Sequence, residues 1–238
     1  MRFLVTRPAA DAARLADALG AQGHNVVVSP LIEIYPTDVA LPDPATIGAL
    51  ALTSANGVRA LAARLQDGGR RALWQSRDAY AVGPQTAAAL AGLGWPQVRQ
   101  ASGTVEALAD LIVATHAPTQ GAVLHIAGRH RAGNLAAALS AQKLECRMAM
   151  LYEAEAADEL SRAARAALAD SDEPIDGVLL YSLRSADLFL TLSDGLVMAQ
   201  RPTALCLSPQ IGEKMRAAGY DVRIAESPDE AGMLALTA

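Results

Sequence analysis

The sequence predicts an α/β fold built on parallel sheets, and three observations support this prediction. Short apolar runs alternate with stretches whose apolar residues recur at helical spacing. Ser, Asn or Gly stands where most of these runs give way to a helix. An internal repeat divides the chain into similar α/β portions. Strands that alternate with helices in this way form parallel sheets covered by helices.

The clearest strand-to-helix junction lies near residue 54. Residues 49–52 are continuously apolar, as in a buried strand, and a helical stripe runs from Val58 to Leu65. Ser54 and Asn56 stand between them, and their side-chain oxygens suit the first N–H groups of a helix. In an open α/β sheet, ligands bind at such junctions, where free N–H groups and the helix dipole attract anions. We therefore expect these junctions to face one ligand.

The other elements follow from the same two periodicities along the chain. Short apolar runs predict the strands, and apolar residues three or four apart, such as Leu15 and Leu19, predict the helices. The expected strands are 3–5, 25–28, 49–52, 78–82, 98, 122–126, 145–152, 177–181, 204–207 and 222–224. The expected helices are 9–22, 58–65, 87–93, 105–114, 135–141, 158–169, 183–192, 211–218 and one after residue 229. Gly23, Gly94 and Gly219 are expected stops, because Gly adopts the left-handed conformation that ends helices.

Two segments indicate connectors. Residues 30–36 are extended and bounded by Pro30 and Pro36, which is typical of a connector or an edge ribbon. The strand expected at 145–152 runs into a second extended connector. The polar stretch 38–44 contains proline and marks a plausible domain boundary.

The internal repeat gives the chain the order A-B-A′-B′. Residues 83–86 align on residues 208–211 at an offset of 125, and the Ser54 junction matches the Ser182 junction at a slightly larger offset. Residues of the first portion match those of the third at an offset of 120. Two pseudo-equivalent lobes are therefore expected, with a cleft as a small-molecule site. The repeat alone leaves open which A portion pairs with which B portion.

Composition excludes several classes of protein. The chain has 238 residues, of which 52% are hydrophobic and 19% charged, so a disordered chain is excluded. A net charge of −5 argues against general nucleic-acid binding. No apolar run is long enough to span a bilayer, and the first residues do not form a signal peptide, so we expect a cytoplasmic protein. Cys146 and Cys206 are expected to be reduced core residues.

Common catalytic and metal-binding patterns are not found. The chain shows no nucleophile elbow and no phosphate-binding loop lysine. The four histidines show no metal-ligand spacing with each other or with the cysteines; they are His24, His116, His125 and His130. His125 lies within an expected strand, where a histidine is more often a core residue than a ligand.

An ordered series of motifs resembles uroporphyrinogen-III synthase. These motifs are Val5-Thr6-Arg7-Pro8, residues 52–58, residues 81–87, Leu151-Tyr152-Glu153 and Ala225-Glu226-Ser227-Pro228. The resemblance covers nearly the whole chain. It implies two similar flavodoxin-like lobes, each a parallel sheet flanked by helices, joined by a two-stranded ribbon. The first lobe would be 1–34 plus 154–238, the second 39–147, and the ribbon 31–38 and 148–153.

The resemblance also implies an activity. Hydroxymethylbilane, a linear tetrapyrrole, would lose its hydroxyl and close into uroporphyrinogen III with its last pyrrole inverted. The enzyme would be a cyclising lyase of tetrapyrrole biosynthesis that needs no cofactor and no metal. We expect a monomer with no nucleic-acid or membrane partner. The upstream hydroxymethylbilane synthase is a further candidate partner.

The resemblance and the junctions together name candidate site residues. Tyr152 matches a family tyrosine at the cleft and is the candidate catalytic residue; the alternative is a tyrosine packed on the ribbon. The candidate substrate-binding residues are Thr6, Arg7, Ser54, Asn56, Gly83, Thr86, Gly128, Arg129, Ser182, Ser185 and Ser208. Arg131 and Arg184 also follow strand ends and could bind carboxylates, although any of these arginines could be a solvated surface charge.

One position departs from the family pattern. Ile211 stands in the second copy where Thr86 stands in the first, so that turn lacks a hydroxyl, for which Ser182 and Ser185 would compensate.

Two other classes of protein are alternatives to this family. A two-lobed protein that binds an anionic ligand without catalysis is the main alternative. A tandem receiver-like protein would need an acceptor aspartate at a strand end, whereas Thr, Ser and Gly stand there.

Overall fold

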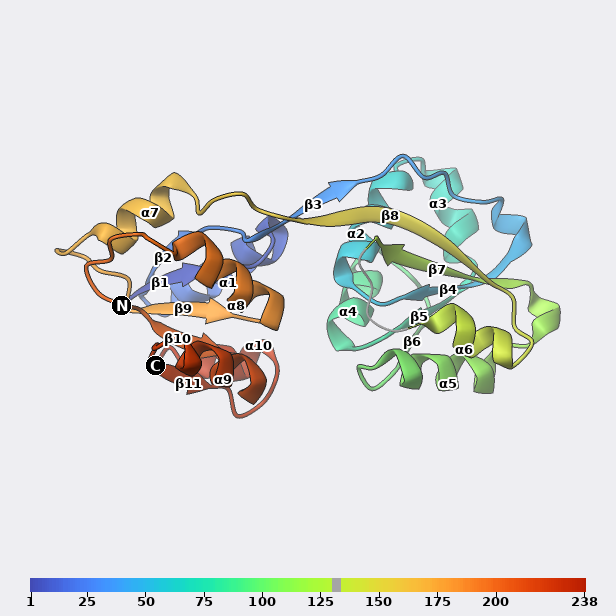
Figure 1. Cartoon of the computed structure of the whole chain (residues 1–238). Helices are drawn as coiled ribbons and strands as arrows, with labels where there is room; N and C mark the ends of the chain where they lie inside the picture. The colour runs from blue at the N-terminus through green and yellow to red at the C-terminus, as the bar shows by residue number, and fades with distance from the viewer. Residues whose placement is uncertain (130–133) are drawn as a thin grey trace. The chain divides into compact units, whose positions relative to one another are not determined.

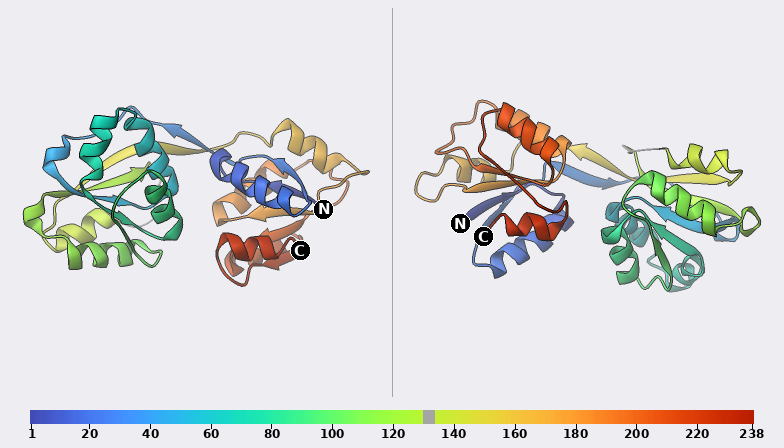
Figure 2. Two further views of the ribbon diagram at one scale, coloured as in Figure 1. Left: turned by 180° about the vertical axis from the view of Figure 1, so that it is seen from behind. Right: turned by 90° about the horizontal axis from the view of Figure 1, so that it is seen from below.

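The chain folds into two compact units, each with its own sheet. The computed structural model describes residues 1–129 and 134–238. Unit 1 comprises Met1–Glu33 and Glu155–Ala238, and unit 2 comprises Ile34–Ala154 (Figure 1). Within each unit, helices cover both faces of the sheet (Figure 2). The expected α/β class with parallel sheets is confirmed.

Unit 1 is a five-stranded parallel sheet in the order β11-β10-β9-β1-β2. Taken along the chain, this is the 2-1-3-4-5 order of flavodoxin-like proteins. Its strands are β1 (Arg2–Val5), β2 (Asn25–Val28), β9 (Gly177–Leu180), β10 (Thr203–Cys206) and β11 (Val222–Ile224). Its helices are α1 (Ala9–Ala21), α7 (Arg162–Ala169), α8 (Leu183–Ser193), α9 (Pro209–Ala217) and α10 (Glu230–Ala235).

Strand β1 fills the cores on both faces of unit 1. Successive side chains of a strand point to opposite faces. Phe3 and Val5 therefore pack in the same cluster as Leu15 of α1, while Leu4 packs in the opposite cluster with Phe189 of α8. A central parallel strand that is covered on both faces has a continuously apolar sequence, and residues Phe3 to Val5 have one.

Unit 2 contains a six-stranded sheet in the order β3-β8-β7-β4-β5-β6. Its strands are β3 (Ile32–Pro36), β4 (Ile47–Leu52), β5 (Asp78–Ala81), β6 (Val98–Gln100), β7 (Ala122–Gly128) and β8 (Cys146–Ala156). Its α-helices are α2 (Ala55–Arg64), α3 (Gly68–Gln75), α4 (Pro84–Gly92), α5 (Val105–Thr115) and α6 (Leu135–Ala141), and short 3₁₀ turns span Pro44–Thr46 and Pro118–Gln120. Pairing is parallel from β8 across to β6.

Unit 2 is a circular permutation of unit 1. The series β8-β7-β4-β5-β6 has the same spatial order as β2-β1-β9-β10-β11, but the chain enters it at a different strand. The register agrees with the repeat: Phe3 lies opposite Val26, and Val123 lies opposite Cys146, each shifted by 120 residues. The A-B-A′-B′ repeat is therefore a repeat of structure.

The offset of 125 holds for most of the B portions but not for their last strands. Helices α4 and α9 begin at Pro84 and Pro209. Gly94 and Gly219, which follow these helices, both have a φ near +80°, as does Gly23 after α1. Ala79 pairs with Val98, whereas Ala204 pairs with Val222, so the offset between these last strands is 124. The alignment therefore has a one-residue gap there.

Helix α7 begins later than expected, and the periodicity did not predict α3. Helix α7 begins at Arg162 because the Ser161 hydroxyl accepts the Ala164 N–H at 3.2 Å. Helix α3 is capped by Asp67, whose carboxylate accepts the Arg70 N–H at 2.7 Å. Helix α3 is short and buries only Trp74, so its apolar signal in the sequence is weak.

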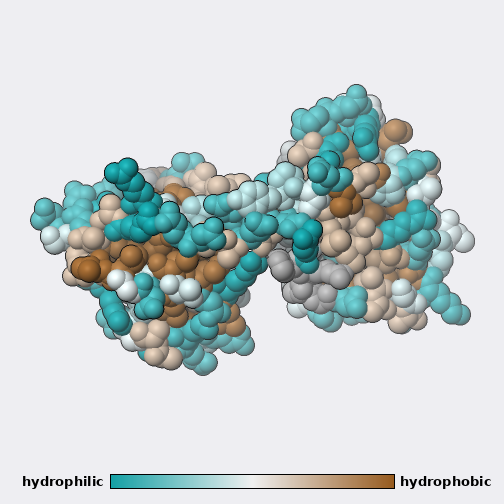
Figure 3. Space-filling view, turned by 45° about the horizontal axis from the view of Figure 1, so that its top comes forward, coloured by the Kyte–Doolittle hydropathy of each residue, from teal (hydrophilic) through white to brown (hydrophobic). Residues whose placement is uncertain are grey.

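Two neighbouring strands, β3 and β8, carry the chain between the units. Strand β3 enters unit 2 and β8 leaves it, so they run in opposite directions. Residues 148–152, expected in the connector, also pair with β7 and so belong to the sheet of unit 2. The surface over these linking strands is largely hydrophilic (Figure 3).

Both cysteines are free, as expected, and burial raises the pKa of each thiol to about 11. Cys206 is buried, and Cys146 is half-buried. Among the residues that the structure describes, no helix is long and apolar enough to cross a membrane.

Truncation of equivalent core leucines should destabilise the two units separately. Leu4 and Leu124 occupy equivalent positions on β1 and β7, and both are fully buried. We expect Leu4→Ala and Leu124→Ala each to lower the free energy of unfolding by about 2–5 kcal/mol, because each leaves a cavity. Hydrogen exchange should rise mainly in unit 1 for the first variant and mainly in unit 2 for the second.

The matched control is Val197→Ala, because Val197 is 84% exposed and its truncation leaves no cavity. Exchange that rises equally in both units for either leucine variant would contradict the assignment of two separate cores.

Candidate functional site

The carboxyl edge of each sheet has one position where the strand order reverses direction. Open α/β sheets bind ligands at this switch point. In unit 1 it lies between β1 and β9, where Thr6 and Tyr181 follow the strands. In unit 2 it lies between β7 and β4, where Gly128 ends one strand and Thr53 follows the other.

At the unit 1 switch point, the polar side chains have hydrogen-bond or ion-pair partners within the fold. The Thr6 hydroxyl is buried and donates to the Leu179 carbonyl oxygen at 2.8 Å, so it links β1 to β9. The Arg7 guanidinium donates to Glu230 at 2.9 Å and to Asp11 at 3.2 Å. It also lies 4.5 Å above the ring of Tyr181. Arg7 therefore holds α1, α10 and the end of β9 together.

Tyr181 places a buried phenol under that guanidinium. Burial raises the pKa of Tyr181 to about 12, although the nearby Arg7 charge lowers it. The phenol therefore stays neutral throughout the physiological pH range.

In unit 2, the predicted cap at Ser54 is confirmed. The Ser54 hydroxyl accepts the Asn56 N–H at 3.0 Å and begins α2. The Asn56 side-chain oxygen in turn accepts a hydrogen bond from Arg59 at 2.5 Å. Thr53 lies 3.4 Å from the His125 ring, which links β4 to β7. This network orders the start of α2 beside the switch point.

Tyr152 lies at the same edge of unit 2, on β8. It is 8% exposed, and it lies opposite Gly128 in the parallel pairing of β7 with β8. Among the described residues, the Tyr152 hydroxyl makes no hydrogen bond. The Arg129 N–H donates to the Tyr152 carbonyl oxygen at 3.1 Å, and the Arg129 side chain, 62% exposed, pairs with Glu153 at 2.5 Å. Arg131 and His130 lie outside the described residues.

Helices α4 and α9 begin without a side-chain cap. Gly83 and Ser208 are their N-cap residues, and neither provides a capping hydrogen bond. By contrast, Ser182 caps α8: its hydroxyl accepts the Ser185 N–H at 3.0 Å and lies 2.8 Å from the Ser185 hydroxyl. Uncapped N–H groups at a helix start are donors for an anion. The two equivalent turns of the repeat thus keep backbone donors available.

Thr86 and Ile211 occupy equivalent places just inside these two helices. Both are buried, Ile211 within the apolar core of unit 1. Among the described residues, the Thr86 hydroxyl makes no hydrogen bond. At the equivalent place in unit 1, the Ile211 side chain adds to the apolar core. Arg184 lies in the first turn of α8.

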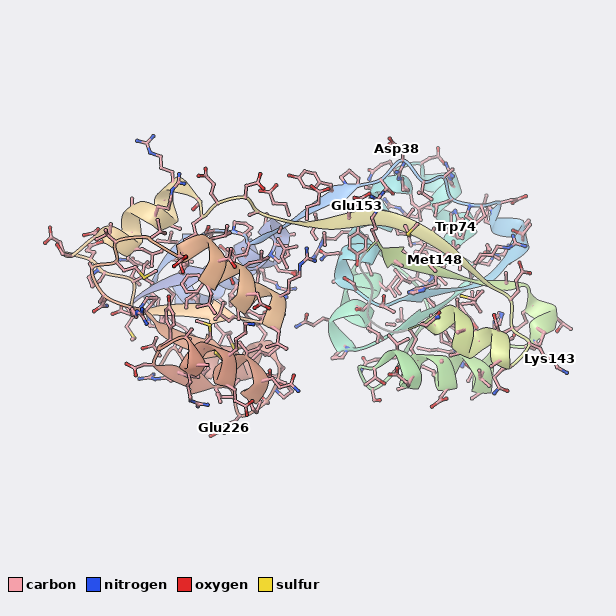
Figure 4. The ribbon with its side chains drawn as sticks, in the orientation of Figure 1. Asp38, Trp74, Lys143, Met148, Glu153 and Glu226 are labelled. Atoms are coloured by element: carbon pink, nitrogen blue, oxygen red, sulfur yellow. The ribbon has the colours of Figure 1, made fainter. Side chains whose placement is uncertain are left out.

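A hollow of about 440 Å³ lies beside β3 and β8 of unit 2. It is lined by Pro36, Thr37, Asp38, Val39, Arg129, Met150 and Glu153. Asp38 follows the end of β3 and Glu153 lies on β8 (Figure 4). Among the described lining residues, two carboxylates face one guanidinium, a balance that does not favour a polyanion. The helix starts suit an anionic ligand better.

In residues 1–129 and 134–238, no group of three or more His, Cys, Asp or Glu side chains is placed to hold a metal ion.

A family model described as uroporphyrinogen-III synthase HemD matches residues 13–235. The chain belongs to the uroporphyrinogen-III synthase family. The match spans both units, so the family is assigned to the whole fold and not to one half. This family comprises cyclising lyases of tetrapyrrole biosynthesis, and membership does not favour a ligand-binding protein without catalysis. No curated protein sequence matches the chain significantly.

Two solved structures of this family share the fold. The uroporphyrinogen-III synthetase of Helicobacter pylori has a TM-score of 0.66 at 20% identity, over 100% of this chain and 98% of that one. A mutant uroporphyrinogen III synthase of Thermus thermophilus has a TM-score of 0.56 at 16% identity, over 100% of this chain and 97% of that one. At these identities the likeness establishes the fold, and residue roles need other support.

Sequence reasoning missed Asp11, Arg59 and Tyr181 at these edges, although it named their partners Arg7 and Asn56. Asp11 lies in the first turn of α1, four residues after Arg7, and the two form an ion pair at 3.2 Å. Arg59 follows Asn56 by one helical turn on α2, a spacing at which helical side chains meet. Tyr181 matches Thr53 in the repeat, but no local pattern predicts that Arg7 lies over its ring.

Tyr181 should ionise later than an exposed tyrosine. Its raised pKa predicts that an absorbance titration at 295 nm contains a component near pH 12, which Tyr181→Phe removes. Because the folded state holds this proton more tightly than the unfolded state does, the stabilising contribution is complete below about pH 10 and is lost towards pH 12.

Tyr35→Phe is the control, since Tyr35 is exposed and its loss should leave the component near pH 12 in place. If Tyr181→Phe leaves the late component in place, the buried position of this phenol is wrong.

Proposed function

We propose that this protein converts hydroxymethylbilane into uroporphyrinogen III, with inversion of the last pyrrole ring. The family match over residues 13–235 is the observation on which this proposal rests. The backbone donors at the starts of α4 and α9 support it, because the substrate is a polyanion that carries many carboxylates.

The reaction makes modest demands on catalytic groups. An electron-rich hydroxymethylpyrrole expels its hydroxyl readily once that oxygen receives a proton or a hydrogen bond. The carbon left behind then bonds to the α-carbon of the last pyrrole that already carries the bridging methylene, which gives a spiro intermediate. The bond from that α-carbon to the original bridging methylene breaks, the released methylene carbon bonds to the other α-carbon of the same ring, and loss of the proton there restores aromaticity with the ring inverted. Free substrate closes without inversion, so the enzyme must hold it in the shape that leads to the inverted ring. Such positioning can contribute several orders of magnitude in rate.

In this proposal, Tyr152 assists the departure of the hydroxyl. A phenolic O–H is a hydrogen-bond donor. The Tyr152 hydroxyl has no hydrogen-bond partner among the described residues, so donation to the leaving oxygen would break no bond to any of them. Its position beside the unit 2 switch point supports this role.

The proposed substrate contacts differ in kind. Gly83 and Ser208 contribute backbone N–H groups, and Thr86 and Ser208 add hydroxyl groups. The side chains of Thr6, Ser54, Asn56, Ser182 and Ser185 already have partners within the fold, so these positions would act mainly through their backbone. Gly128 likewise offers only backbone. Arg129 is the more exposed cation and would have to leave Glu153, and Arg7 would have to exchange Asp11 or Glu230 for a substrate carboxylate.

Further features belong to the same proposal. We infer a cytoplasmic monomer with no cofactor, no metal, no nucleic-acid partner and no membrane partner. The reaction that forms hydroxymethylbilane must supply the substrate, which makes hydroxymethylbilane synthase the candidate upstream partner.

The activity can be tested by the isomer that forms. Freshly prepared hydroxymethylbilane incubated with the protein should give the inverted isomer after oxidation and chromatographic separation. Substrate in buffer, or with heat-denatured protein, should give the uninverted isomer. If the native protein also yields only the uninverted isomer, the proposed function is wrong.

Tyr152→Phe should slow turnover without unfolding the protein. Loss of one hydrogen-bond donor to the leaving oxygen should reduce kcat by up to about 10²-fold. The KM and the thermal midpoint should change little, because the ring and its packing remain. Steady-state rates and thermal melts measure these effects.

The matched control is Tyr220→Phe, which removes a phenolic oxygen from unit 1; the Arg201 guanidinium lies over the Tyr220 ring, 5.2 Å from its centroid. It should retain the unmutated rate. A Tyr152→Phe rate equal to that of this control would leave Tyr152 as a packing residue.

A further inference from the structure

The ring of Tyr152 rests on the backbone of Gly128. A Cβ atom built on Gly128 would lie 2.7 Å from Cε2 of Tyr152 and 2.8 Å from its Cζ. It would also lie 3.1 Å from the hydroxyl oxygen. These separations are shorter than carbon atoms tolerate, so no residue with a side chain fits at position 128 while Tyr152 keeps this position.

The backbone conformation of Gly128 does not itself require glycine. Six glycines of the described chain have positive φ, and Gly128 is not among them. It is the last residue of β7 and follows an irregularity in the pairing with β8. Its need for glycine therefore comes from the close approach of the Tyr152 ring and not from backbone strain.

Gly57 borders the same ring from α2. A Cβ atom on Gly57 would lie 3.8 Å from Cε1 of Tyr152 and 3.4 Å from a side-chain carbon of Ile126. Both distances are ordinary van der Waals contacts. The ring therefore has glycine backbone near two of its edges, from β7 and from α2. The contact at Gly128 is much the tighter of the two.

We propose that Gly128 is a positioning residue for Tyr152: its missing side chain lets the ring lie against the end of β7 and so fixes the direction of the hydroxyl. This role is separate from the backbone contact with substrate proposed above for Gly128. The kinetic part of the inference rests on the proposed function, because it requires that Tyr152 acts on the substrate. The structural part does not.

The expected effect of a side chain at position 128 follows from the geometry of tyrosine. The ring is rigid and can move only by rotation about χ1 and χ2. Cβ of an alanine at 128 would be held by the backbone of β7, so the Tyr152 ring would have to move. Rotation about χ2 leaves Cζ and the hydroxyl oxygen in place, because both lie on its axis, so the contact with Cζ requires rotation about χ1. The hydroxyl is at the far end of the ring and therefore moves furthest in that rotation.

The experiment compares Gly128→Ala, Tyr152→Phe and the double variant, with Gly92→Ala as the matched control. A Cβ on Gly92 would meet nothing within 4 Å, so this control adds the same methyl group without a clash. Ring-¹³C tyrosine labelling gives one signal set for each of the five tyrosines. Loss of a set in Tyr152→Phe assigns Tyr152. Steady-state kinetics with hydroxymethylbilane follow on the same proteins.

Gly128→Ala should shift the Tyr152 ring signals and lower kcat about as much as Tyr152→Phe does, with little change in KM. The double variant should be no slower than either single variant, because a displaced hydroxyl and a missing hydroxyl have the same consequence. Gly92→Ala should leave the signals and the rate unchanged.

Two results would overturn the inference. Unchanged Tyr152 ring signals in folded Gly128→Ala would show that the ring does not depend on this glycine. If the fold-decrease in kcat of the double variant equals the product of the two single decreases, Gly128 affects turnover by another route. A Tyr152→Phe protein with the unmutated rate would instead overturn the proposed role of Tyr152, and the ring signals would still decide whether Gly128 positions it.

Discussion

The pairing of β7 with both β4 and β8 is the constraint on which the candidate site of unit 2 depends. Parallel pairing aligns the carboxyl ends of these strands at one edge, and that edge receives Thr53, Gly128 and Tyr152 together. These residues are far apart in the chain, and no local interaction would unite them. A buried parallel strand pairs on both sides and is covered on both faces, so a shift in register would disrupt its close packing on both faces.

The two units share one topology, but the carboxyl edges of their sheets carry different side chains. In unit 1 the switch point is occupied by Arg7 stacked on Tyr181 and held by Asp11 and Glu230. In unit 2 it is bordered by glycine, and a tyrosine from the neighbouring strand lies across it. Ion pairs rigidify the first edge, whereas close packing on backbone orders the second. A repeat of fold therefore does not imply a repeat of chemistry, because side chains at equivalent strand ends are free to differ.

Local chemistry made much of the fold predictable. Ser54, Thr104 and Asp229 cap helices as their types suggest, and Gly94 and Gly219 stop helices in the left-handed conformation. The start of α7 was misplaced, because Ser161 competes with the earlier polar residues as a cap. Of the candidate site, the turns were found from the sequence, but the pairing of Arg7 and the packing of Tyr152 depend on neighbours distant in the chain.

The sequence by itself determined the α/β class, most strands and helices, the A-B-A′-B′ repeat and the resemblance to a family. All of these follow from periodicity, turn residues and short motifs, which are local along the chain. Only the tertiary structure decided the permuted strand order, the occupied edge of unit 1 and the contact of Tyr152 with Gly128. The physical reason is that strand register and close packing depend on which distant segments meet, and no local pattern of residues encodes that meeting.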